Sequence, residues 1–340
     1  MQVGTATDWR EVSAGKTHSF GIKDNGTLWA WGDNQNATLG DGTFVNKSVP
    51  TQIGTATNWK MISNNQSRSI AIKEDGTLWV WGLNASLGTG AGSSTSHITV
   101  PTQVGIDTNW KVATAGFGFF LALKTDHTLW AWGGGDNGQL GNGGINGTHI
   151  PTQIGTDTNW QSIDADLNSS FAIKSDGTLW AWGYNFYGTL GNGTQANLLV
   201  PTQIGTATDW ETISTGTATT SALKADGSLY SWGYNAFGGI GDGTYVDKLS
   251  PELVTTCTLD TDDFNTKKVN LYPNPVQNQL FINSEETQYY QIYSILGTTL
   301  SEGTLSVGSS IDCSALSSGV YLLSLRDGFG KVNTVKFVKE

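Results

Sequence analysis

The sequence predicts an all-β protein: a β-propeller of four-stranded blades followed by a small Ig-like β-sandwich. Three observations lead to this fold class. A unit of about 50 residues returns five times, each unit joins short β-type segments through glycine-containing turns, and non-repeating sequence follows residue 254. Helical repeats are excluded because no unit shows a 3.6-residue period.

Tryptophan marks the repeat most clearly, because all 14 tryptophans occupy three positions of the unit. A residue that returns once per structural unit is most simply part of the scaffold, so we do not expect these rings to form a binding site. The first position holds Trp9, Trp59, Trp110, Trp160 and Trp210; the second holds Trp29, Trp79, Trp130, Trp180 and, in the fifth unit, Tyr230; the third holds Trp31, Trp81, Trp132, Trp182 and Trp232.

Residues 151–200 give the clearest copy of the unit. Its last two β segments join through Asp176-Gly177, where glycine adopts a positive φ at little cost. The third unit instead has Asp126-His127 at this turn. Four segments are expected as the strands of one blade: 151–155, 160–163, 170–174 and 178–183.

Side-chain alternation predicts two apolar faces on each blade. Trp180 and Trp182 share one face of their strand, and Leu179 and Ala181 share the other. The middle residue of the preceding strand is always small, as at Ala172. A sheet that is apolar on both faces must be covered on both, which radial stacking of blades achieves.

The end of the repeats divides the chain into three parts. We expect a propeller, a short linker and a C-terminal domain that changes to non-repeating β-type sequence. The expected boundaries are 1–254 for the propeller, with units 1–50, 51–100, 101–150, 151–200 and 201–254, then 255–268 for the linker and 269–340 for the C-terminal domain.

The composition excludes some partners. A net charge of −11 and a pI near 4.7 argue against nucleic acid, whose phosphates require a basic surface. The sequence shows no transmembrane run and no motif for a metal or another cofactor, so we expect none of these. Cys257 and Cys313 are consistent either with one disulfide or with two thiols.

The chain begins inside a repeat. Residues 2–9 match 52–59 and 203–210, and later copies are preceded by Pro-Thr, whereas Met1 stands in the place of that threonine. We therefore expect further repeats and a signal peptide upstream of this sequence. A closed ring of five blades is the alternative.

The repeat resembles a known family. All five units carry variants of S-F-A-I-K-x-D-G-T-L-W-A-W-G-x-N followed by L-G-x-G, as at Leu39-Gly40 and Gly42. This pattern resembles the regulator of chromosome condensation repeat over residues 2–254. The resemblance implies a β-propeller, usually of seven blades.

The C-terminal domain is predicted to be an antiparallel sandwich of seven or so strands. Two strands are expected around a Pro-Asn-Pro turn in 269–282, a hairpin in 289–300 with its turn at Leu296-Gly297, and two more strands around Asp327-Gly328.

Four motifs of this domain resemble the C-terminal sorting domain of the type IX secretion system of Bacteroidetes-type bacteria. The resemblance implies contact of residues 269–340 with that secretion machinery, and a secreted or outer-membrane surface-attached protein whose tail is commonly cleaved. The motif residues are Tyr272, Pro273, Asn274, Pro275, Gly297, Gly319, Tyr321, Lys336 and Lys339.

No catalytic pattern is found, so we predict that the protein is not an enzyme. The histidines occupy non-equivalent positions of the repeat. His18 stands where other units have Arg68, Phe119, Ser169 and Thr219, and is interpreted as a loop or strand-edge residue. The acidic run Asp260, Asp262, Asp263 and Asn265 resembles half a calcium loop and is interpreted as a solvated linker.

Variable loops are the candidate binding residues, because a propeller gathers equivalent loops on one rim. One variable set, before the third segment of the third unit, contains Phe117, Phe119 and Phe120. The other variable set lies between the third-position Trp-Gly and the L-G-x-G element, and it predicts an aromatic patch over two units. The alternative is that these rings pack against a neighbouring blade, and we favour it for Phe186 and Phe237. The patch residues are Tyr184, Phe186, Tyr187, Tyr234 and Phe237.

The leading hypothesis is a secreted or surface-attached, non-enzymatic propeller that binds an extracellular protein or glycan at its rim. Inhibition of a secreted enzyme, as by one bacterial relative, is a special case. The alternative is a secreted lyase or hydrolase acting on polysaccharide. Nucleotide exchange on a GTPase, the activity of the member that names the repeat, is a weaker alternative because fold does not carry function.

Overall fold

The computed structural model describes residues 5–89, 93–254, 271–282, 287–294, 298–326 and 332–340. The chain divides into two compact units, Met1–Cys257 and Thr258–Glu340. The boundary falls in the expected linker, 255–268, which lies outside the described residues. Within the described ranges the elements are strands, and no helix there is long and apolar enough to cross a membrane.

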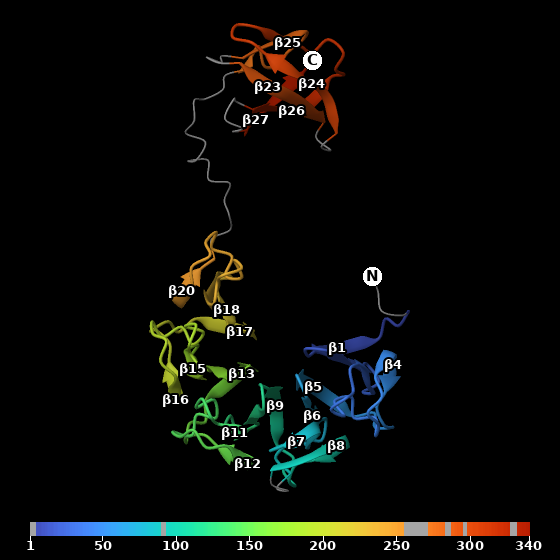
Figure 1. Ribbon diagram of the computed structural model, residues 1–340, viewed down its shortest axis with the longest axis vertical. Coiled ribbons are helices and arrows are strands. Elements are labelled where there is room, and N and C mark those ends of the chain that lie inside the picture. The colour runs from blue at the N-terminus through green and yellow to red at the C-terminus, as the bar shows by residue number, and fades with distance from the viewer. Residues whose placement is uncertain (1–4, 90–92, 255–270, 283–286, 295–297, 327–331) are drawn as a thin grey trace. The chain divides into compact units, whose positions relative to one another are not determined.

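Five four-stranded antiparallel sheets, here called blades 1 to 5, follow one another along an arc in the first unit (Figure 1). Their strands are, for blade 1, β1 (Trp9–Ala14), β2 (His18–Lys23), β3 (Leu28–Gly32) and β4 (Lys47–Gln52); for blade 2, β5 (Trp59–Asn65), β6 (Arg68–Lys73), β7 (Leu78–Ala85) and β8 (Ser93–Gln103). Blade 3 contains β9 (Trp110–Ala115), β10 (Phe119–Lys124), β11 (Leu129–Gly133) and β12 (Thr148–Gln153); blade 4 contains β13 (Trp160–Asp166), β14 (Ser169–Lys174), β15 (Leu179–Gly183) and β16 (Leu198–Gln203); blade 5 contains β17 (Trp210–Gly216), β18 (Thr219–Lys224), β19 (Leu229–Gly233) and β20 (Lys248–Leu253).

The blades are out of phase with the sequence units. The segment at Pro151 belongs to β12, which pairs with β11 through Trp130↔Gln153 and closes blade 3. The expectation that 151–200 forms one blade is therefore wrong: this unit supplies the first three strands of blade 4, and the outer strand β16 (Leu198–Gln203) crosses from this unit into the next. Proline fits this outer position because an edge strand does not need every N–H for its ladder.

The D-G-T-x-W motif builds the tight turn between the second and third strands. Asp176 Oδ1 accepts hydrogen bonds from the N–H (3.1 Å) and hydroxyl (2.6 Å) of Thr178, whose Oγ1 accepts the indole N–H of Trp180 at 2.8 Å. These bonds lower the pKa of Asp176. Gly177 has φ +75°, and His127 adopts φ +62° at the same turn of blade 3.

Tryptophan and glycine lock each blade to the one before it. Trp182 is fully buried and donates its indole N–H to the carbonyl of Gln139 in blade 3 at 2.9 Å. Gly141, with φ +73°, lies so close that a Cβ there would meet this indole at 2.8 Å. The small Ala172 pairs with Trp180 on the same face. The two apolar faces predicted from sequence are confirmed.

Four buried clusters join blades 1 and 2, 2 and 3, 3 and 4, and 4 and 5. Figure 1 shows blades 1 and 5 at the two ends of an open arc. Trp31 lies on the face of blade 1 that points away from blade 2, and it is only half-buried. Its equivalents in the other blades are fully buried: Trp81, Trp132, Trp182 and Trp232.

The second unit is a sandwich of seven described strands. One sheet orders β21 (Leu271–Tyr272), β22 (Gln279–Ile282) and β25 (Ser310–Asp312); the other orders β24 (Thr299–Leu305), β23 (Gln288–Ser294), β26 (Gly319–Arg326) and β27 (Val332–Lys339). The antiparallel prediction is confirmed, while the turns at Leu296-Gly297 and Asp327-Gly328 lie outside the described residues.

Cys313 lies in the core of this sandwich and forms no disulfide with any described residue, and burial raises the pKa of its thiol. Its candidate disulfide partner, Cys257, lies outside the described residues.

Candidate functional site

Two sets of variable loops meet along one edge of the propeller, here called the rim. One set joins the first and second strands of each blade, and the other follows the third strand. A backbone N–H of the second set donates to a carbonyl of the first set in every blade: Asp33 to Thr17, Leu83 to Ser67, Gly134 to Gly118, Tyr184 to Asn168 and Tyr234 to Ala218, all at 2.8–2.9 Å.

The five predicted aromatic residues form one continuous row over blades 4 and 5, here called the aromatic surface. Ring centroids lie 6.4 Å apart for Tyr184 and Phe186, 5.0 Å for Phe186 and Tyr187, 4.8 Å for Tyr187 and Tyr234, and 6.1 Å for Tyr234 and Phe237. The Tyr187–Tyr234 contact joins the two blades.

Phe186 and Phe237 are the exposed members of this row, at 57% and 87% exposure. The expectation that these two rings pack against a neighbouring blade is therefore wrong. Their loops are short and end in glycine, so the side chains project from the rim and contact the half-buried tyrosines beside them.

A buried asparagine shapes each of these two loops. The side chain of Asn185 is fully buried, and Asn235 has an equivalent hydrogen-bond set in blade 5. Such bonds satisfy polar groups that the tight loop removes from water. For Asn185, Nδ2 donates to Asn192 Oδ1 (3.0 Å), Thr194 O (2.9 Å) and Ala196 O (3.1 Å), and Oδ1 accepts the N–H of Leu190 (2.9 Å).

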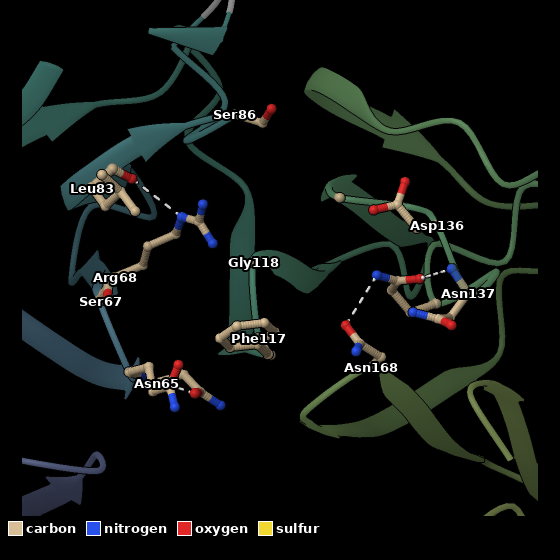
Figure 2. Close-up of a pocket in the computed structure, with 14 residues that line it drawn as sticks. Asn65, Ser67, Arg68, Leu83, Ser86, Phe117, Gly118, Asp136, Asn137 and Asn168 are labelled. Carbon is tan, nitrogen blue, oxygen red and sulfur yellow. Dashed lines mark hydrogen bonds between the residues drawn. The ribbon is translucent and has the colours of Figure 1, made fainter. Parts of the chain in front are cut away.

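A cavity of about 450 Å³ lies at the same rim over the seam between blades 2 and 3, and we call it the seam pocket. Figure 2 shows Arg68 entering from blade 2, Asp136 and Asn137 facing it from blade 3, and Asn168 reaching in from blade 4, with Phe117 between them. This pocket was not predicted from the sequence.

Of the three phenylalanines in the variable loop region of blade 3, Phe117 alone serves the pocket. It is 46% exposed, whereas Phe119 and Phe120 are fully buried in the blade interfaces. Strand alternation and the Gly116 and Gly118 on either side of it place Phe117 on the loop itself.

The seam pocket lies where two units depart from the repeat. In blade 3, Gly135 replaces the loop asparagine, and a Cβ there would meet the carbonyl oxygen of Asn146 at 2.6 Å. In blade 2, Asn84 is buried but its Oδ1 has no partner among the described residues. The replacement of the loop asparagine by Gly135 in unit three was the signal in the sequence that could have found the pocket.

The innermost strands of all five blades line a central cavity of about 500 Å³. Asp164 and Asp166 alternate on β13 and both line it, and burial raises the pKa of each. Asp164 accepts the N–H (2.8 Å) and hydroxyl (3.0 Å) of Thr215 from blade 5, and Asp166 accepts a 3.4 Å bond from Asn65. This pair of aspartates was not predicted from the sequence, because the two residues belong to no recognised motif.

His18 begins β2, as expected of a strand-edge residue, but it is almost fully buried. Neither ring nitrogen has a hydrogen-bond partner among the described residues, and burial lowers the pKa to about 4. The ring packs edge-on against Phe20, with centroids 5.7 Å apart.

In the part of the chain that the structure describes, no three His, Cys, Asp or Glu residues are arranged to hold a metal ion. The half calcium loop, Asp260 to Asn265, lies outside the described residues.

In the second unit, motifs far apart in the sequence meet. Asn274 Oδ1 accepts the N–H of Val338 at 2.9 Å, and the N–H of Glu340 donates to Val276 O at 3.0 Å. The segment from Tyr272 to Pro275 therefore lies against the last strand, which carries Lys336 and Lys339.

The remaining motif residues have distinct positions. Gly319 begins β26, and Tyr321 stacks on Phe337 with centroids 5.6 Å apart while its hydroxyl donates to Ser317 O. Pro273 and Pro275 follow cis peptide bonds. Gly297 lies outside the described residues.

Fold and rim together define a β-propeller with an appended export domain. Residues 2–277 match the family model of the RCC1-like domain, so the chain belongs to the RCC1-like domain family. Residues 270–340 match the secretion system C-terminal sorting domain, which indicates export to the medium or cell surface through type IX secretion in a Bacteroidetes-type bacterium. The comparison with curated proteins gave no match.

Two solved structures show the same propeller fold. Yeast RCC1 (Prp20), solved with bound Kap60, has a TM-score of 0.65 at 20% identity over 74% of this chain and 62% of its own. Human WBSCR16 has a TM-score of 0.64 at 22% identity over 73% and 67%. The present chain thus spans less than two thirds of the yeast chain.

Proposed function

We propose that this protein is a non-enzymatic binding propeller that captures an extracellular protein or glycan on its rim. The observation that carries the proposal is the aromatic surface, in which exposed Phe186 and Phe237 extend a row of rings across two blades. A contiguous exposed apolar patch on a protein surface commonly marks an interaction site, and aromatic side chains are enriched at such sites.

The loops that carry the aromatic surface are rigidly held, and this supports a binding role. Asn185 fixes one aromatic loop, and the Tyr187–Tyr234 contact ties this loop to the next. A preorganised surface loses little conformational entropy when a partner docks.

We further propose that the sorting domain delivers the propeller and is then removed. Residues beyond the first unit form their own core, so the propeller does not need them to bury its blades. Mass spectrometry of protein from the medium and outer membrane checks this. We expect no peptides beyond about residue 267, and full-length protein outside the cell would contradict it.

Polysaccharide cleavage is the alternative, and its best candidates are Asp164 and Asp166 in the central cavity. Paired carboxyl groups serve as acid and base in glycosidases. Here Asp164 already accepts two bonds from Thr215, which links blades 4 and 5. This favours a structural role.

The test uses the full chain against two immobilised panels, extracellular polysaccharides and bacterial secreted proteins, with release of reducing ends measured in parallel. Phe186→Ala/Phe237→Ala is compared with Phe44→Ala, which removes a ring of 51% exposure from blade 1. We expect at least one partner in the panels whose binding only the double variant weakens, by at least about tenfold, without release of reducing ends.

Two results would contradict the proposal. Equal binding by the double variant and the wild type would remove the aromatic surface from the site. Release of reducing ends that disappears in Asp164→Asn and Asp166→Asn would establish the enzyme instead.

A further inference from the structure

We infer that the seam pocket binds a neutral sugar residue of a glycan chain. Its lining comes from blades 2, 3 and 4, apart from the aromatic surface on blades 4 and 5. It can therefore bind sugar whether or not the aromatic surface has a partner.

The polar side chains of the pocket are held in place before any ligand arrives. Arg68 Nε donates to Leu83 O at 3.2 Å, and Asn168 Oδ1 accepts a bond from Gln139 Nε2 at 3.3 Å. Asn65 Nδ2 donates at 3.3 Å to a backbone carbonyl of blade 3. Side chains fixed in this way form a preorganised site.

The two walls offer complementary hydrogen-bonding groups. The Arg68 guanidinium supplies donors on the blade 2 side, and the Asp136 carboxylate supplies acceptors on the blade 3 side, as Figure 2 shows. Asn137 and Asn168 add amides that can donate and accept. A sugar hydroxyl both donates and accepts, so a ring with hydroxyls around its edge can satisfy both walls.

Phe117 supplies the apolar element between these walls. Its backbone N–H donates to Leu167 O at 2.6 Å, which fixes the loop, while its ring is 46% exposed. The equivalent positions in the other blades hold Lys16, Gln66, Leu167 and Thr217, so the ring is particular to blade 3. The C–H face of a pyranose packs on such a ring.

Charge and apolar content select a neutral sugar over other ligands. Among the described lining residues, Arg68 is the one cation and Asp136 the one carboxylate, in a chain of net charge −11, which disfavours a polyanion. Leu83 and Phe117 are the large apolar residues of the lining, too few to take apolar peptide side chains. The volume lies in the range of small-ligand sites, about 300–1,000 Å³.

The test is binding of the full chain to an array of neutral oligosaccharides, followed by calorimetry with the best of them. Tetragalacturonate and a lysine-free acidic peptide serve as the anionic and peptide probes. The variants are Phe117→Ala, which removes the stacking face, and Asp136→Asn, which keeps the shape of an exposed side chain and removes its charge. Phe44→Ala is the matched control.

We expect a neutral oligosaccharide to bind, with its affinity lowered at least about tenfold by Phe117→Ala and by Asp136→Asn, and unchanged by Phe44→Ala. Phe186→Ala/Phe237→Ala should also leave it unchanged. Three results would overturn the inference: no neutral sugar binds, binding ignores both pocket variants, or only tetragalacturonate or the peptide binds. If the aromatic surface still binds its partner in those cases, the proposed function stands without the sugar site.

Discussion

The seam pocket and the aromatic surface are built from equivalent loops of one rim, yet one is hollow and the other is covered by rings. In both regions the loop after the third strand bonds to the loop before the second, as Gly134 does to Gly118 and Tyr184 to Asn168. The frame is therefore the same. What differs is the side chains and one internal residue of the loop.

That internal residue is the buried asparagine. The side chain of Asn185 holds its loop through four hydrogen bonds, and aromatic residues stand on either side of it in the sequence. Blade 3 has Gly135 instead, and blade 2 has Asn84, whose Oδ1 has no hydrogen-bond partner in the described part of the chain. A pocket and a row of aromatic rings therefore occur on one frame, and their loops differ both in the exposed side chains and at the asparagine position.

The largest expected effect is a difference in stability between a substitution in the blade interface and one on the rim. Trp180→Ala should lower the free energy of unfolding by about 3–5 kcal/mol, because the indole packs in the interface of blades 3 and 4. Phe186→Ala should change it by less than about 1 kcal/mol. Urea denaturation followed by tryptophan fluorescence reports the propeller alone, since no tryptophan follows Trp232. Equal losses would show that Phe186 belongs to the frame.

The next effect tests the cause of the difference between the two regions. Asn185→Ala should cost about 2–3 kcal/mol, because it leaves a buried N–H of Leu190 without its acceptor. Asn84→Ala, at the same repeat position, should cost less than about 1 kcal/mol, since its Oδ1 bonds to nothing described. The same denaturation measurement compares them. A larger loss for Asn84→Ala would break the comparison.

The smallest effect extends the comparison to blade 1, where His18 occupies the repeat position of Arg68. Its pKa is about 4 in the fold against an ordinary 6.5, so the unfolded chain binds the proton more readily between these values. Stability should therefore fall by about 2 kcal/mol as the pH drops from 7 to 5.

His18→Phe is the matched control, because Phe119 fills this position in blade 3. Denaturation of both proteins across this pH range should show the loss in the wild type alone. A variant as sensitive to pH as the wild type would assign the effect to other groups.

Much of the fold could be read from the sequence because scaffold residues repeat with the period of the structure. The positions of Trp180, Trp182 and Gly177 follow from strand alternation and turn chemistry, and the structure has them there. Which four strands make up one blade could not be predicted in the same way. Hydrogen bonding of β12 to β11 joins strands separated by a long loop, and no local pattern distinguishes this from pairing within the next unit.

The rim was only partly predictable. Aromatic residues in variable loops are easily recognised in a sequence, so the row from Tyr184 to Phe237 could be predicted. Its two phenylalanines were expected to be packed against a blade, but they are exposed. The seam pocket depends on Arg68, Asp136 and Asn168 from three blades. The residues at these three positions differ from unit to unit, so they carry no periodic signal, and only the folded arc brings them together.

The offset between unit and blade has an evolutionary consequence. DNA duplicates stretches of sequence, whereas the protein must gain whole sheets to remain folded. Because blade and unit have the same length and the outer strands of blades 1 to 4 cross the unit boundaries, copying one period inserts one complete sheet wherever the copied segment begins. Each new sheet also carries its own pair of rim loops, so a gene of this kind can lengthen first and diversify its surface afterwards, one sheet at a time.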